Sequence, residues 1–328
     1  MIYPLLTLTR NTFLESIRQP VYTVLVLAGC LGMVLMPSLS AYTMEDDDRF
    51  LLELGVSWVF MAGVLLAAFT ATGVLTREID NRTVLAVLSK PVARPLFILG
   101  KFLGVALAMA MAVWTVSMVL LLAVRHGVMS TAAHTIDWVV VLFGLGAAMV
   151  GLLVAAWGNY MYQWVFTSTL MRLLAVGLTV AVGLTLFVAD GFEFQSPLVE
   201  FSAAGMMREG QVPIALAMVL LALVFLTAVA IAASTRLTQV MTLSVTLGVV
   251  VIGVIHHHLT GAAAAEAGEF GWLVYGLPNL QLLWPGEALV QEQTITAGYL
   301  AGAAAYAACL TAAALTLAIA LFQQRELG

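Results

Sequence analysis

The sequence has little charge and little cysteine. Only 9% of its 328 residues are charged and 62% are hydrophobic, whereas an ordinary soluble domain is about one quarter charged. This composition excludes a soluble globular protein, and we expect no nucleic-acid partner. The two cysteines, Cys30 and Cys309, each lie inside an apolar run, which excludes a disulfide framework.

The usual catalytic and metal-binding motifs are also absent. Gly100-Lys101 lacks the upstream glycine of a phosphate-binding loop, and there is no H-E-x-x-H zinc motif. His256-His257-His258 are consecutive, so on a helix they point about 100° apart and do not converge on one ion. We therefore expect no catalytic residue, no metal ligand and no cofactor bound by this chain, and we interpret the histidines as the polar outer end of a helix.

Long apolar segments dominate what is present. A membrane-spanning helix needs about 20 mostly apolar residues, and eight segments satisfy this requirement. They predict an all-α, polytopic transmembrane bundle with spans at 21–42, 51–75, 102–124, 136–156, 165–189, 213–233, 240–255 and 298–322. The break between the fourth and fifth spans depends on Gly158-Asn159-Tyr160 and on Arg172. The spans carry no chain of Asp, Glu or Lys at mid-depth, which argues against a self-powered secondary transporter.

Charge predicts the orientation. If the N-terminus is cytoplasmic, ten of the thirteen Lys and Arg residues fall on the cytoplasmic side, as the positive-inside rule requires. The acidic run at 45–48 then lies in an outer loop, and both termini are cytoplasmic. A cleaved signal peptide over 1–36 is an alternative, which the long leader before the apolar run disfavours.

The leader, 3–19, predicts an amphipathic helix that ends at Gln19-Pro20. Its expected apolar side carries Leu6, Phe13, Leu14 and Ile17, with Arg10 inside the same arc. Its expected polar side carries Asn11, Thr12, Glu15, Ser16 and Arg18. We expect this helix to lie in the cytoplasmic membrane surface; the alternative is a solvated leader.

A basic island at 76–101 separates the second and third spans and holds five of the thirteen Lys and Arg residues. Within it, 78–89 predicts a short helix of about 18 Å, with Glu78 and Asp80 in the first turn and an apolar later part. This apolar part either packs beneath its own bundle or fills a groove on a partner protein. A second irregular segment, 271–288, contains Pro278, Pro285 and several aromatic residues, and predicts an outer interfacial or re-entrant helix.

The island also carries a family pattern. The residues Glu78, Thr83, Val87-Leu88-Ser89, Lys90-Pro91-Val92, Arg94, Phe97 and Gly100-Lys101 are close to E-x-x-x-x-T-x-x-x-L-x-[ST]-[KR]-P-[VI]-x-R-x-x-[FY]-x-x-G-K, with Val87 at the leucine position. With the N-terminal helix and the two spans before it, this loop resembles the permease subunits of ABC-2-type ABC transporters. The segments 233–243, 278–281 and 321–326 are similar to the bacterial branch grouped with multicopper-enzyme maturation permeases. That family has a core of six spans, whereas this sequence predicts eight.

The resemblance implies two regions, an elbow helix at 1–20 and a transmembrane domain at 21–328 with a coupling loop at 77–101. It implies elbow residues Arg10, Phe13 and Arg18. It implies that a partner ATPase is contacted by Glu78, Ile79, Asp80, Arg82, Thr83, Lys90 and Arg94.

The expected function is a permease subunit of an ATP-driven exporter in the bacterial inner membrane. ATP and Mg would be bound by a separate P-loop subunit, and the permease would pair with a second copy or a related chain among membrane lipids. The alternatives are a secondary transporter or channel without an ATPase, and a structural membrane anchor. The sequence does not indicate the substrate.

Overall fold

The structure is a computed structural model of the whole chain. It describes residues 2–40, 47–80, 93–128, 136–202, 205–266, 276–291 and 293–324. The side chains of residues 2, 40, 75–80, 261–266 and 290 are not described.

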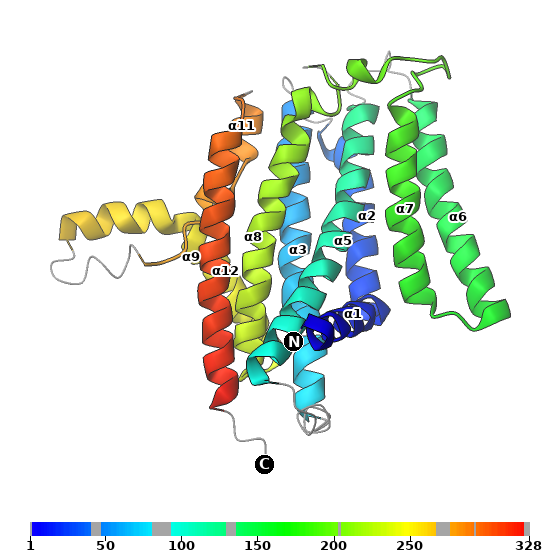
Figure 1. Cartoon of the computed structure of the whole chain (residues 1–328). Coiled ribbons are helices and arrows are strands. Elements are labelled where there is room, and N and C mark those ends of the chain that lie inside the picture. Colours follow the sequence, from blue (N-terminus) through cyan, green and yellow to red (C-terminus); the bar gives the residue numbers. More distant parts are fainter. Residues whose placement is uncertain are drawn as a thin grey trace.

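The described residues form helices joined by short irregular segments (Figure 1). Their elements are α1 Ile2–Arg18, α2 Pro20–Ser40, α3 Asp47–Asp80, α5 Arg94–His126, α6 Trp138–Tyr162, α7 Phe166–Thr185, η1 Pro197–Val199, η2 Arg208–Gly210, α8 Gln211–Ser234, α9 Gln239–Glu266, η4 Gln281–Leu283, α11 Gly286–Val290 and α12 Ala297–Gln323. In this part of the chain, eight helices are long and apolar enough to cross a membrane. Each corresponds to one predicted span, so the prediction of an all-α polytopic bundle is confirmed.

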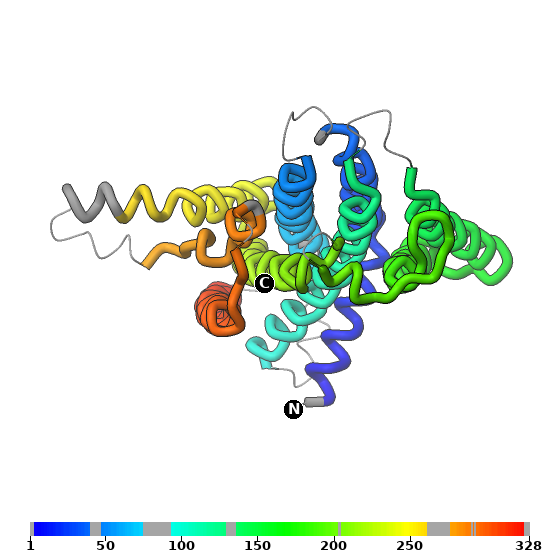
Figure 2. Tube along the Cα trace, turned by 90° about the horizontal axis from the view of Figure 1, so that it is seen from above, coloured from blue at the N-terminus to red at the C-terminus, as the bar shows by residue number. Residues whose placement is uncertain are grey.

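Three helices form the interior of the bundle. Apolar side chains of α3, α5 and α8 are buried along most of their length, whereas α6, α9 and α12 expose most of theirs. Figure 2 shows α6 and α7 on one side of this interior and α9 on the opposite side. Because a bilayer solvates apolar side chains, the exposed leucines and valines of the outer helices fit contact with lipid.

The helix α3 is longer than the predicted second span. Its 34 residues extend over about 50 Å, whereas the hydrocarbon core of a bilayer is about 30 Å thick. Figure 1 shows its last turns continuing past α1, at the end of the bundle where α12 ends. Glu78, Ile79 and Asp80 form the last turn of α3, so the prediction that they begin a separate short helix is wrong. Residues 81–92, the rest of the predicted coupling helix, lie outside the described residues.

The segment 276–291 does not span, in agreement with the prediction. It consists of η4 and α11 joined by turns, and its backbone hydrogen-bonds to its neighbours. The Leu280 amide donates to Gly253 O at 3.0 Å, and the Asn279 amide donates to Tyr306 Oη at 2.7 Å. Trp284 packs edge-on against Phe60 of α3, so its ring lies against a span; Trp272 and Tyr275 are outside the described residues.

The helix α1 lies across the end of the bundle (Figure 1), and the predicted boundary at Gln19-Pro20 is confirmed. The face that packs on the bundle differs from the prediction. Thr12 and Ser16, expected on the outward polar side, are 1% and 0% exposed, whereas Leu6 is 61% exposed.

Close packing explains this orientation. A Cβ added at Gly104 of α5 would lie 2.4 Å from Thr12 Cβ and 2.8 Å from Thr9 O. Small side chains on α1 therefore face glycine on α5, which brings the two backbones together. Amphipathicity alone selects the larger apolar residues and misses this small-residue face.

We predict that Gly104→Ala lowers the free energy of unfolding by about 1–3 kcal/mol, because the new methyl group overpacks the contact with α1. The matched control is Gly183→Ala in α7, where no atom lies within 4 Å of the added Cβ. Thermal unfolding of the two variants in detergent checks this, and equal melting temperatures would contradict it.

Candidate functional site

The end of the bundle that carries both described termini is rich in basic residues. Arg94 and Lys101 lie at the start of α5, Arg172 lies near the start of α7, and Arg236 follows α8. At this end lie α1, the end of α3, the start of α5 and the end of α12. We call these parts together the basal platform. Since cationic loops favour the cytoplasmic side, the platform is the candidate site for contact with a soluble partner.

An ion pair between buried Lys101 and the 41% exposed Glu15 ties α1 to α5 in the platform. Lys101 Nζ lies 3.4 Å from Glu15 Oε2, and the Lys101 side chain is 4% exposed. The same ammonium lies 5.7 Å from the ring centroid of Phe97, one turn earlier on α5. A buried ammonium needs such partners, because removing it from water without them is costly.

Two arginines hold the last turn of α12. Arg94 Nη1 donates to Gln323 O at 2.8 Å, and Arg236 Nε and Nη2 donate to Leu321 O at 3.1 and 2.8 Å. The final carbonyls of a helix lack intrahelical donors and carry the negative end of its dipole. Charged hydrogen bonds therefore join the start of α5 and the end of α8 to the end of α12. The rings of Phe97 in α5 and Phe322 in α12 also stack, with their centroids 5.5 Å apart.

The structure places the other predicted elbow residues in this region. Phe13 packs against the bundle core, whereas Arg10 and Arg18 are exposed. The backbone carbonyl of Arg18 accepts a hydrogen bond from Thr167 Oγ1 at 3.0 Å, which joins α1 to α7.

The predicted coupling residues are only partly described. Glu78, Ile79 and Asp80 belong to the projecting end of α3, but their side chains are not described. Arg82, Thr83 and Lys90 lie outside the described residues. Arg94 is thus the one coupling residue whose side-chain contact is known, and that contact is with α12.

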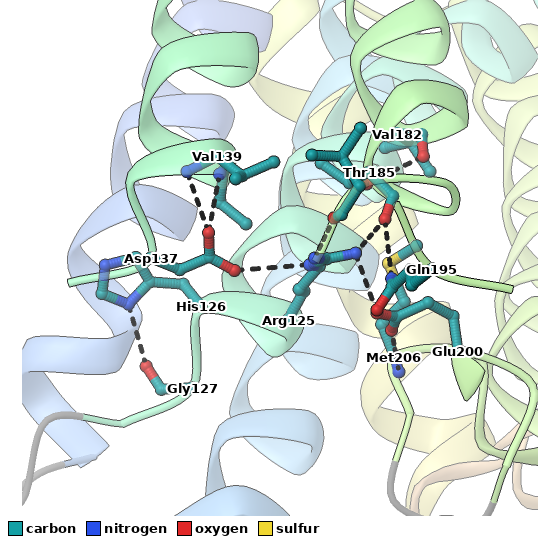
Figure 3. A network of polar contacts seen from close by, with 12 residues as sticks. Arg125, His126, Gly127, Asp137, Val139, Val182, Thr185, Gln195, Glu200 and Met206 are labelled. Atoms are coloured by element: carbon teal, nitrogen blue, oxygen red, sulfur yellow. Dashed lines mark hydrogen bonds and ion pairs between the residues drawn. The ribbon is translucent and has the colours of Figure 1, made fainter. Parts of the chain in front are cut away.

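A second polar site, which the sequence analysis missed, occupies the opposite end of the bundle. Figure 3 shows Arg125 between two carboxylates: its Nη1 lies 2.8 Å from Glu200 Oε1, and its Nε lies 3.3 Å from Asp137 Oδ2. All three side chains are nearly buried, with 6%, 9% and 11% of Arg125, Glu200 and Asp137 exposed. We call these three residues the Arg125 cluster.

Backbone groups satisfy the rest of the cluster. Arg125 also donates to Thr185 O and to Val188 O, the latter at 2.6 Å. Asp137 Oδ1 accepts from the amides of Val139 and Val140 and so caps α6. Gln195 Nε2 donates to Glu200 Oε1 at 3.0 Å, and the Met206 amide donates to Glu200 Oε2 at 3.2 Å.

The Arg125 cluster joins α5, α6, the end of α7 and the loop that follows α7. A signal was present in the sequence: Arg125 ends an apolar run, and Asp137 directly precedes another. Glu200 lies 75 positions after Arg125, however, and nothing local relates the two. The cluster lies at the ends of helices, so it does not place charge at mid-depth.

The three histidines lie in the later part of α9, which runs sideways out of the bundle (yellow in Figure 1). His256 is buried, whereas His257 and His258 are exposed, with their ring centroids 6.0 Å apart in an edge contact. Among the described residues, no group of three His, Cys, Asp or Glu side chains is arranged to hold a metal ion.

Fold and charge together define the class: the chain is a polytopic α-helical membrane protein. Comparison with protein-family models and with curated proteins finds no match to this chain. A finer function therefore has to be argued from the basal platform and the Arg125 cluster.

We predict that Arg125→Gln lowers the free energy of unfolding by about 3 kcal/mol or more, because Asp137 and Glu200 are left buried without their cation. Arg172→Gln is the control, since Arg172 is exposed and its removal should change stability by less than about 0.5 kcal/mol. Thermal unfolding in detergent compares the two, and a similar melting temperature for both variants would contradict a stabilising role of the cluster.

Proposed function

We propose that this chain is the membrane-spanning permease subunit of an ATP-driven ABC transporter, acting as an exporter in a bacterial inner membrane. It would pair with a second permease copy or a related chain. A separate P-loop ATPase would dock on the basal platform and bind ATP and Mg. The chain itself would perform no hydrolysis, since it has no phosphate-binding loop.

The observation that carries this proposal is the length of α3, whose last residues belong to the basic island. About 20 Å of α3 exceeds the thickness of the hydrocarbon core, and Glu78, Ile79 and Asp80 lie at its tip. The helix α5 begins at Arg94, only 13 residues after α3 ends. A partner that binds the segment between these helices would therefore act on two of the three central helices at once.

The platform contacts supply rigidity. The Lys101–Glu15 pair and the close approach of Gly104 to Thr12 tie α1 to α5. Arg94 ties the start of α5 to α12. A displacement at the coupling loop would thus move α1, α5 and α12 together instead of being absorbed by local bending.

We predict that Glu78→Ala combined with Arg82→Ala reduces the amount of ATPase that co-purifies with the permease about tenfold, because loss of a few central contacts typically dominates an interface. Affinity purification in mild detergent, followed by identification of co-eluting P-loop ATPases and their stoichiometry, measures this.

The matched control is Arg49→Ala combined with Glu53→Ala, which makes the same change of charge at the opposite end of α3. It should leave the ATPase bound. Co-purification that is unchanged in the Glu78 and Arg82 variant would contradict docking at this loop. Gradient-driven transport by the chain alone in liposomes would contradict the ATP-driven function itself.

A further inference from the structure

A large apolar cavity lies between α2, α5, α6 and α7, at the end of the bundle away from the termini. Its volume is about 780 Å³, within the range of small-molecule sites. Its wall includes Leu122 of α5, Gly144 of α6 and Leu178 of α7. Because the cavity is open on one side, its occupant can come from the surroundings of the bundle.

The lining excludes water as that occupant. Apart from Ser38 and His126, and the thiol of Cys30, the lining side chains are apolar. A buried water needs two to four polar partners, which most of this wall does not offer. Ser38 and His126 both lie in the last turns of their helices, so the polar groups gather at one end of the cavity.

The cavity opens sideways to the lipid-facing surface. Leu31 and Val34 of α2 and Leu145 of α6 line it, yet they are 63%, 53% and 57% exposed. Residues that are both cavity wall and outer surface mark an opening between α2 and α6. At this depth the surroundings are acyl chains, so the bilayer supplies the occupant.

The length of the cavity agrees with that of a lipid tail. Lining residues run along α2 from Leu27 to Ser38, which at 1.5 Å per residue is about 17 Å. One leaflet of the hydrocarbon core is about 15 Å thick. Spread over that length, 780 Å³ leaves a slot narrower than a helix, whose diameter with side chains is about 10–12 Å.

We propose that this cavity is a binding site for an acyl chain of a membrane phospholipid, which enters between α2 and α6 with its headgroup beside Ser38 and His126. The lipid fills the space between the α6–α7 pair and the central helices. Gly144 lines this space without a side chain, and a Cβ there would lie 3.2 Å from Leu122 Cδ1. The site does not depend on the ATPase partner proposed above.

The test uses the full-length protein in nanodiscs that contain a phosphatidylethanolamine with a diazirine on its acyl chain. After illumination, mass spectrometry compares the label on cavity residues with the label on α12, whose Leu317 is exposed to lipid. In the wild-type protein the cavity residues should carry label, and a brief incubation with excess unlabelled phospholipid before illumination should lower the label on the cavity residues less than the label on α12.

We expect Gly144→Leu and Ala148→Leu, which both fill the cavity, to lower the ratio of cavity label to α12 label about tenfold. Gly146→Leu is the control on the same helix, because Gly146 faces open space and does not line the cavity; its ratio should equal that of the wild type. If Gly144→Leu fails to fold, Ala148→Leu decides the outcome.

Equal ratios in all variants would overturn the proposal, since the label would then report only the lipid that surrounds every helix. Absence of label from the cavity together with cross-links between two copies of the chain would also overturn it, in favour of a protein occupant.

Discussion

The structure depends on one constraint: in a bilayer, backbone polar groups and charged side chains must find their partners within the protein. The backbone meets this requirement by forming helices, and the charged side chains meet it by gathering at the ends of the spans. Lys101 is buried, but Glu15 and the Phe97 ring lie beside it. Arg125 is buried as well, between two carboxylates and two backbone carbonyls. The apolar middle of the bundle is thereby left free of charge, and small-residue contacts can decide how its helices pack.

The helix α5 connects the two polar ends. Lys101 and Arg125 are separated by about 36 Å along it, and both are fixed to other elements. The same helix supplies Leu122 and His126 to the wall of the apolar cavity. A rigid rod that is anchored at both ends transmits displacement along its length. The basal platform, the cavity and the Arg125 cluster therefore share one central helix.

The sequence predicted all eight spans, because a run of about 20 apolar residues is a strong and local signal. The sequence-based prediction failed where contacts with a distant part of the same chain determine the local structure. Leu8 and Thr12 pack against α5 because Gly100 and Gly104 admit a close neighbour, which the periodicity of α1 alone does not reveal. The acids of α3 suggested the start of a helix, whereas α3 continues through them. The Arg125 cluster joins residues from distant parts of the chain, and only the fold brings them together.

The central claim is that the loop between α3 and α5 faces the cytoplasm, where an external ATPase can reach it. The most direct measurement is labelling of an Asn81→Cys variant, in intact cells and after permeabilisation, with a maleimide that does not cross the membrane. The account predicts labelling only after permeabilisation. Labelling in intact cells would place this loop outside the cell and contradict the account.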